Sequence, residues 1–268
     1  MTFVPALPAT GLNGWVFLQR TAQSQQEAIS ENQSVKRLTE NFTENIPDVR
    51  TAEALVADRR LLTVALQAYG LEDDIDNKFY IQKVLESDPA DPESFANSLA
   101  DKRYLKMAEA FGFGSLLGPS TNLNSFAANV VSLYETKEFE ARIGDIDEDM
   151  RLALGLERDL GEIASSSSSN DTKWFSIMGD PPLRRVFEVS LGLPSSLGSL
   201  DIDRQLEIFK ERAQSVLKTD QISEIGTENN IEELTRTFLL RAQIDTSIDT
   251  SGGSIALTLL QSAPNLFA

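Results

Sequence analysis

The chain has 268 residues, of which 41 are acidic and 24 basic, so its formal net charge is −17, and it contains neither Cys nor His. A surface this negative repels phosphate groups, which argues against nucleic acid as a partner. Without Cys and His there is no disulfide, no Ser-His-Asp triad and no thiolate or imidazole ligand for a metal, so any catalysis would depend on carboxylates, Lys or Tyr.

Apolar residues recur every three or four positions along most of the chain, which is the period of a helix with one buried face. Sustained alternation of Val, Ile and Thr, the signal of strands, does not occur. The sequence therefore predicts an all-α, multi-helix globular domain. Its expected parts are an irregular N-terminal segment and polar helix forming an arm (1–49), a first helical half (50–164), a Ser-rich loop (165–172) and a second helical half of the same domain (173–268).

The N-terminal arm contains a long, mostly polar helix in this prediction. Residues 1–13 are expected to be irregular, and the helix spans Trp15–Ile46, with a narrow apolar seam that Gln25 interrupts. Such a helix packs along its own domain or pairs with a partner chain. In the second case the candidate partner contacts are Trp15, Phe17 and Leu18, which are large apolar side chains in a polar segment.

Residues 88–114 carry the clearest helix punctuation in the chain. Asp88-Pro89 and Asp91-Pro92 each resemble a helix start, because Asp accepts hydrogen bonds from exposed N–H groups and Pro fits the first helical turn. The apolar stripe behind them closes at Gly112 and Gly114. The sequence predicts two short helices here and no reactive group.

The other predicted helices follow from the same spacing. In chain order they span Thr51–Gly70 (one helix or a helix pair), Ile75–Leu85, Phe126–Tyr134, Phe139–Ile143, Asp145–Ala164, Asp180–Leu191, Asp201–Leu217 and Ile231–Ile244. Asp145, with Glu148 three residues later, predicts a capping box at the start of its helix. Ser115–Asn124 and the serine run Ser165–Ser169 are predicted loops, and Ser254–Leu260 is a short strand or helix.

One pattern occurs twice. Ala57–Leu71 aligns without gaps with Gly179–Leu193, and Asp74-Ile75-Asp76 then matches Asp201-Ile202-Asp203. The first Asp of each triplet is placed to cap the helix that follows it. The pattern predicts an internal pseudo-repeat of a helix–loop–helix pair inside one domain, because two copies are too few for a solenoid.

Two motifs resemble ligand sites, and neither is complete. Asp145, Asp147 and Asp149 alternate like calcium ligands, but Met150 stands where that loop requires Gly, so helix capping explains them better. Gly112–Gly118 is glycine-rich, but no Lys-Ser/Thr follows it as in a phosphate-binding loop. The sequence therefore assigns no catalytic, cofactor-binding or metal-binding residue.

Several longer stretches together resemble the bacterial "domain of unknown function 1217" family. They are Ser87–Gly114, Tyr134–Arg142, Arg151–Leu160, Trp174–Pro194 and Leu200–Arg212. Their distinctive residues are helix caps, aromatics and glycines, so the resemblance brings no catalytic residue with it. Genes of this family often lie in flagellar neighbourhoods, which implies an association with flagellar assembly or function.

Three functions are consistent with these features. We expect a non-enzymatic helical interaction or structural protein, with flagellar components among its protein partners. One alternative is a carboxylate-based hydrolase of the glycan type, which needs two facing acids; the acids considered are Glu93, Asp101, Glu109 and Asp201. The other is an acidic adaptor or chaperone for an exported basic subunit.

The expected location is the cytoplasm, or outside the cell after export through the flagellar apparatus. No apolar run approaches the roughly 18–20 residues of a membrane-spanning helix, and no secretory signal is visible at the N-terminus. We therefore expect no membrane insertion.

Overall fold

The computed structural model describes residues 4–244, and every regular element in this range is helical. The all-α prediction is confirmed. No helix in the described range is long and apolar enough to cross a membrane. The element predicted at Ser254–Leu260 lies outside the described residues.

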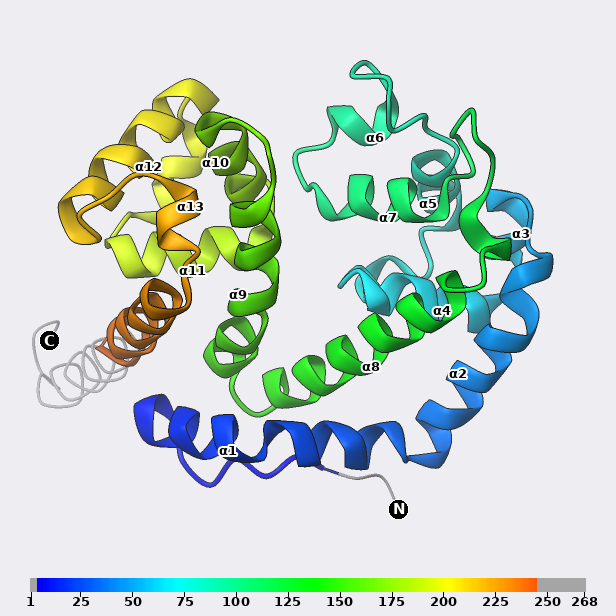
Figure 1. Ribbon diagram of the computed structural model, residues 1–268, viewed down its shortest axis with the longest axis horizontal. Coiled ribbons are helices and arrows are strands. Elements are labelled where there is room, and N and C mark those ends of the chain that lie inside the picture. Colours follow the sequence, from blue (N-terminus) through cyan, green and yellow to red (C-terminus); the bar gives the residue numbers. More distant parts are fainter. Residues whose placement is uncertain (1–3, 245–268) are drawn as a thin grey trace, which may run out of the picture.

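Two long helices form a V that organises the molecule. These are α8 (Phe126–Gly144) and α9 (Glu148–Ser165), and Figure 1 shows a lobe of shorter helices beside each of them. We call them the first lobe, which includes α8, and the second lobe, which includes α9. The predicted break within α8 is wrong, because residues 126–144 form one continuous helix.

Asp147 caps α9 by accepting a hydrogen bond from the backbone N–H of Met150 at 3.2 Å. The predicted cap at Asp145 is therefore wrong by two residues. Asp145 instead follows the last residue of α8, where its own N–H donates to the carbonyl of Ala141. The turn between the two long helices is only a few residues long, which keeps α8 and α9 in contact near their junction.

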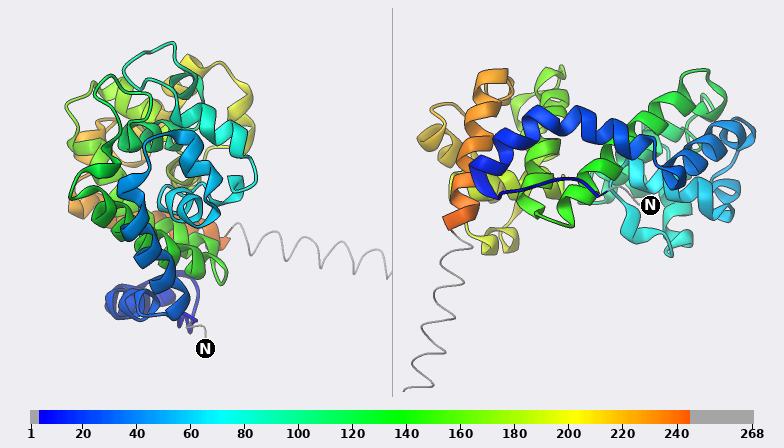
Figure 2. Two further views of the ribbon diagram at one scale, coloured as in Figure 1. Left: turned by 90° about the vertical axis from the view of Figure 1, so that its right-hand side faces the viewer. Right: turned by 90° about the horizontal axis from the view of Figure 1, so that it is seen from below.

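The N-terminal segment forms two helices rather than the predicted single one. They are α1 (Gly11–Ser30) and α2 (Gln33–Asn45). The break occurs at Asn32, whose side chain accepts a hydrogen bond from the N–H of Ser34 at 3.0 Å and so caps a new helix. Both helices pack against α8, and α2 also packs against α4, so they lie along the base of the V (Figures 1 and 2).

Gln25 interrupts the apolar seam of α1 for a structural reason. Its side chain is buried, its Oε1 accepts from the N–H of Ala6 at 2.6 Å, and its Nε2 donates to the carbonyl of Ala6 at 3.2 Å. A buried amide is stable when both of its polar atoms are paired. Gln25 therefore holds the extended segment before α1 against the helix.

Short helices build the first lobe around α8. They are η1 (Ile46–Asp48), α3 (Ala52–Ala57), α4 (Arg59–Ala68), η2 (Glu72–Asp74), α5 (Lys78–Leu85), α6 (Phe95–Ser98), α7 (Arg103–Phe111) and η3 (Ser120–Asn122). Of these, α4 makes the most extensive contact with α8. The buried face of α4 and Phe111 of α7 contribute to the main core, which runs through both lobes.

The two Asp-Pro pairs make turns rather than helix starts, so that prediction is wrong. Asp88 accepts a hydrogen bond from the N–H of Ala90 at 3.0 Å, and Asp91 from the N–H of Glu93 at 2.9 Å. Each side chain thus closes a local turn with a backbone group two residues later. The next helix, α6, begins at Phe95, and α7 ends at Gly112, as predicted.

The second lobe consists of helices around α9. They are α10 (Asn170–Met178), α11 (Pro181–Leu191), η4 (Ser195–Ser199), α12 (Ile202–Val216), α13 (Ile222–Ile225) and a helix over residues 228–244. Trp174 is fully buried at its centre, with Phe187 and Phe209 at ring-centroid distances of 5.4 and 6.0 Å. The predicted helix from Asp180 to Leu191 is confirmed, with Asp180 as its cap.

The two copies of the repeated sequence share their helix ends. Gly70 and Gly192 both have left-handed backbone angles, with φ of +67° and +65°. After each glycine a leucine N–H bonds back into its helix, from Leu71 to Leu66 at 2.9 Å and from Leu193 to Glu188 at 2.8 Å. Glycine takes this conformation at the end of a helix without the strain of a side chain.

The helix starts differ between the copies. Asp201 caps α12, as predicted, by accepting from the N–H of Asp203. Asp74 caps no helix, because α5 begins only at Lys78; its carboxylate accepts instead from the side chains of Asn77 and Tyr104. The pseudo-repeat of the whole helix pair stays a prediction.

Candidate functional site

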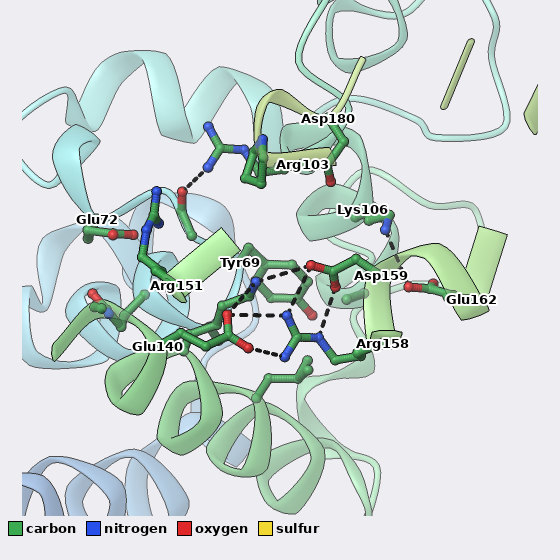
Figure 3. Close-up of a pocket in the computed structure, with 18 of the residues that line it drawn as sticks. Tyr69, Glu72, Arg103, Lys106, Glu140, Arg151, Arg158, Asp159, Glu162 and Asp180 are labelled. Carbon is green, nitrogen blue, oxygen red and sulfur yellow. Dashed lines mark hydrogen bonds and ion pairs between the residues drawn. The ribbon is translucent and has the colours of Figure 1, made fainter. Parts of the chain in front are cut away.

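A cavity of about 430 Å³ lies between the two lobes. We call it the interlobe cavity (Figure 3). Its walls come from the end of α4, from α7 and α8 in the first lobe, and from α9 and the start of α11 in the second. The lining carries five basic side chains (Arg103, Lys106, Lys137, Arg151 and Arg158) and six acidic ones (Glu72, Glu109, Glu140, Asp159, Glu162 and Asp180).

One wall of the cavity is a cluster of four charged residues, which we call the charge cluster. Arg158 of α9 donates to Glu140 of α8 at 2.5 Å and to Asp159 at 2.8 Å. Lys137 of α8 lies 3.1 Å from Glu140 and 3.4 Å from Asp159. Because α8 and α9 each supply two members, the charge cluster ties the two arms of the V together.

The charge cluster favours the ionised form of Asp159. Burial would raise the pKa of Asp159, but Lys137 and Arg158 outweigh it and hold that pKa below its ordinary value. An Asp with a depressed pKa stabilises the fold above its unfolded pKa, and this contribution is lost as the pH falls through the lower, folded value. Asp159 therefore favours the folded state at neutral pH.

Asp180 reaches the same cavity from the start of α11. Its Oδ1 accepts a hydrogen bond from the N–H of Leu183 at 3.1 Å, and its side chain is buried. Burial, with the charge of Asp159 nearby, raises the pKa of Asp180, and the bond from Leu183 opposes that rise only in part. Its negative charge is thus disfavoured although its oxygen is needed as a cap.

This conflict gives a testable prediction for Asp180→Asn. An Asp with a raised pKa makes the protein less stable as the pH rises through that value, whereas Asn keeps the capping oxygen without the charge. We expect Asp180→Asn to unfold at a higher urea concentration than the wild type at pH 7, with the difference shrinking as the pH is lowered towards 4. Asp180→Ala, which loses the cap, should cost about 1 kcal/mol. A less stable Asp180→Asn would contradict this account.

Four polar side chains in the lining make neither a hydrogen bond nor an ion pair within 4.0 Å among the described residues: Gln67, Tyr69, Glu72 and Glu109. The carboxylates of Glu72 and Glu109 accept no hydrogen bond and form no ion pair, and the Tyr69 hydroxyl makes no hydrogen bond. Oε2 of Glu72 is also shielded from solvent. Burial raises the pKa values of Glu109 and Tyr69. These groups are the hydrogen-bonding capacity that the cavity leaves free.

The three predicted partner contacts lie on α1 and differ in exposure. Leu18 is 0% exposed and belongs to the core, so its side chain is not available to a partner. Trp15 is partly buried against the core and lines a groove between α1, α9 and the last helix. Phe17 is partly exposed. The amphipathic pattern could not separate these three, because the docking partner of α1 is a distant helix.

The four acids considered for hydrolysis do not converge. Glu109 lines the interlobe cavity, Asp101 pairs with Arg103 at 2.7 Å, and Asp201 caps α12. Glu93 is exposed on the turn before α6. Among residues 4–244, no three acidic side chains are grouped as a metal site would require.

The sequence did not predict the interlobe cavity. Its lining comes from six helices between Gln67 and Pro182, and no local motif links them. The five basic side chains of the lining are spread over α7, α8 and α9, and no spacing in the sequence indicates that these helices face one another.

Comparison with protein families gives a clear assignment. The family described as "Protein of unknown function (DUF1217)" matches residues 68–231, well over half of the chain. The chain belongs to the DUF1217 family. The matched region contains α7, α8, α9 and α11 entire, so most of the cavity lining lies within it. None of the curated proteins matches the chain.

A solved structure has the same overall fold as this DUF1217 chain. It is the crystal structure of protein AGR_C_984 from Agrobacterium tumefaciens, with a TM-score of 0.70 and 25% sequence identity. The match covers 91% of this chain and 99% of that one. The fold is thus shared over nearly the full length of both chains.

Proposed function

We propose that this DUF1217 protein is a non-enzymatic, protein-binding component associated with the flagellum. The protein-binding part of the proposal is supported by two exposed leucines in the connection between α7 and α8. Leu116 and Leu117 are 96% and 98% exposed. Leu123 in the same connection is also exposed. We call residues 112–118 the leucine turn.

The leucine turn is held in one shape by its own hydrogen bonds. Ser115 donates its N–H to Gly112 at 3.1 Å, and Gly118 donates to Ser115 at 3.0 Å. Gly112 and Gly118 both have positive φ, of +68° and +81°. A Cβ on Gly112 would lie only 3.0 Å from the carbonyl oxygen of Gly118, so the close turn needs glycine there.

The connection is also anchored to the body of the first lobe. Thr121 is buried in η3, and its hydroxyl donates to the carbonyl of Val49 at 2.6 Å. The two leucines are therefore presented on a supported turn. Burying a leucine side chain is worth about 1.5–3 kcal/mol, so adjacent exposed leucines are a surface that a partner's apolar pocket would bind.

The flagellar part of the proposal rests on the family. The resemblance to this family implies an association with flagellar assembly or function, and membership of the family is shown by the match over residues 68–231. The non-enzymatic part is supported by the absence of Cys and His and by the spread of the four candidate acids over separate sites. Binding a partner through the apolar side chains of the leucine turn requires neither Cys or His nor a pair of facing acids.

A pull-down tests the proposal directly. The full-length protein with Leu116→Ser and Leu117→Ser is compared with wild type in lysates of flagellated cells, and bound flagellar components are quantified by mass spectrometry. Since interface residues that fill a pocket cost more than 2 kcal/mol when truncated, we expect at least a roughly tenfold loss of the bound component.

The matched control is Phe79→Ser on α5, which removes another apolar side chain that is 81% exposed. It should retain the wild-type amount of the flagellar component. Equal recovery by the leucine double variant, or equal loss by Phe79→Ser, would contradict the assignment of the leucine turn.

A further inference from the structure

We propose that a groove on the second lobe binds an acidic, partly apolar segment of a protein partner. The groove has a volume of about 450 Å³ and lies between α11 and the helix over residues 228–244. We call it the arginine groove, and its lining includes Arg185, Glu188, Val189, Gly192, Arg241 and Ile244. It shares no lining residue with the interlobe cavity, and the proposal does not depend on the leucine turn.

Two guanidinium groups meet at the edge of this groove, where α11 ends. A Cβ built on Gly192 would lie 2.6 Å from Nη1 of Arg241 and 3.5 Å from Nη2 of Arg212. Because both distances run to one point, the two nitrogens lie within about 6 Å of each other, and their charges repel. Within residues 4–244, neither guanidinium has a carboxylate oxygen within 4.0 Å. An anion bound beside both of them would offset this repulsion.

Arg212 has a structural role, and Arg241 has none that the contacts reveal. The Nε and Nη2 groups of Arg212 donate to the carbonyl of Leu191 at 3.2 and 2.7 Å, as expected of a cation at the negative end of a helix. Arg241 donates no hydrogen bond to any described residue. A guanidinium group has five N–H donors, so Arg241 brings the full set to the groove.

The remaining lining residues select an anion. Glu188, the one acid in the lining among the described residues, is already paired with Arg184 at 2.8 Å, and its side chain is only 12% exposed. Arg185 is exposed and, like Arg241, has no carboxylate within 4.0 Å in the described part of the chain. The unused capacity of the arginine groove is therefore that of two cationic donors, which calls for a ligand with carboxylate or phosphate oxygens.

The apolar part of the groove favours a protein segment over a small anion. Val189, Leu193, Pro194 and Ile244 line it together with the arginines, and Ile244 is 57% exposed. Inorganic phosphate would leave these side chains in water. A segment that carries Leu or Ile between Asp or Glu residues would cover them and place its carboxylates beside the guanidinium groups. Such a segment uses both kinds of surface that the groove presents.

Fluorescence anisotropy with the full-length chain tests this site. The probe is a fluorescein-labelled peptide, Gly-Asp-Ile-Asp-Leu-Gly-amide, in salt of roughly 0.15 M, which screens the negative charge of the rest of the chain. The comparison peptide has Asn in place of both Asp residues, and inorganic phosphate is the competitor. We expect saturable binding of the Asp peptide, with a Kd at least about tenfold weaker for the Asn peptide and for Arg241→Gln, because charge-assisted hydrogen bonds are lost.

Arg236→Gln is the matched control, since Arg236 is an exposed residue of the same helix and does not line the groove. It should bind the Asp peptide like the wild type, and Ile244→Ser should bind it more weakly. Both arginine variants should melt at temperatures close to that of the wild type. No saturable binding, equal binding of the Asn peptide, or equal loss in Arg236→Gln and Arg241→Gln would overturn the proposal. Full displacement by phosphate together with unchanged binding in Ile244→Ser would identify a general anion site and would also overturn it.

Discussion

Replacing Trp174 with Ala is expected to lower the free energy of unfolding by about 3–5 kcal/mol, the usual cost of removing a large buried aromatic side chain. The Trp174 side chain is fully buried and packs edge-on against Phe187. Its indole N–H donates to the carbonyl of Asp220 at 2.9 Å, which connects α10 to the segment before α13. The variant loses both the packing and that bond. Urea unfolding followed by circular dichroism measures the change.

Two further variants separate these contributions. Trp174→Phe retains most of the packing and removes one of the two donors to the Asp220 carbonyl, the other being Asn170 Nδ2 at 3.0 Å, so it should cost less than Trp174→Ala. Trp15→Ala removes the same type of side chain from a partly buried position on α1 and should also cost less. A loss below about 1.5 kcal/mol in Trp174→Ala would show that Trp174 is not the centre of the second-lobe core.

Replacing Glu140 with Ala is the other change with a large expected effect. Glu140 is buried and accepts from Arg158 at 2.5 Å and Lys137 at 3.1 Å. Its removal leaves Lys137 and Arg158 with Asp159 as their one remaining shared carboxylate, and breaking such an ion pair in a fully buried site costs about 3–5 kcal/mol. Because the Arg158 side chain is still 29% exposed, solvent relieves part of this penalty, and we expect about 2–3 kcal/mol.

The control is Glu157→Ala on α9, one position before Arg158 and exposed. It should change the unfolding free energy by less than about 0.5 kcal/mol. The double variant Glu140→Ala with Arg158→Met should be more stable than Glu140→Ala alone, because it no longer holds a largely buried guanidinium that has lost one of its two carboxylates. Equal effects of Glu140→Ala and Glu157→Ala would mean that the charge cluster does not hold α8 and α9 together.

Helix ends that depend on one side chain were predictable from the sequence. Asp180 before Pro181 caps α11, and Gly192 ends it with positive φ. Such signals succeed because the capping side chain, the proline and the glycine all act within one helical turn. Asp201 at the start of α12 is a further example.

The same reasoning failed where a local alternative existed. Asp88 and Asp91 close turns with the N–H groups two residues later, which uses the same acceptor chemistry as a helix cap. The break between α1 and α2 at Asn32 was missed because the apolar seam continues on both sides of it. Side-chain caps show where a helix can start but not which of two starts is used.

The interlobe cavity and the leucine turn were beyond the reach of the sequence for different reasons. The cavity depends on α7, α8 and α9 meeting across the lobes, and that arrangement is set by tertiary packing. The leucine turn was predicted as a loop, but its exposure is a property of the folded surface. Conversely, Leu18 looked available in the sequence and is buried because α1 packs along α8.

The most direct test of the proposed function is photo-crosslinking in living flagellated cells. A photoreactive amino acid replaces Leu117 in the full-length protein, and the control carries it at Phe79, which is also exposed. The account predicts a covalent adduct with a flagellar structural or assembly protein from position 117 and none from position 79. Adducts of equal yield from both positions, or no flagellar protein among the products of position 117, would contradict it.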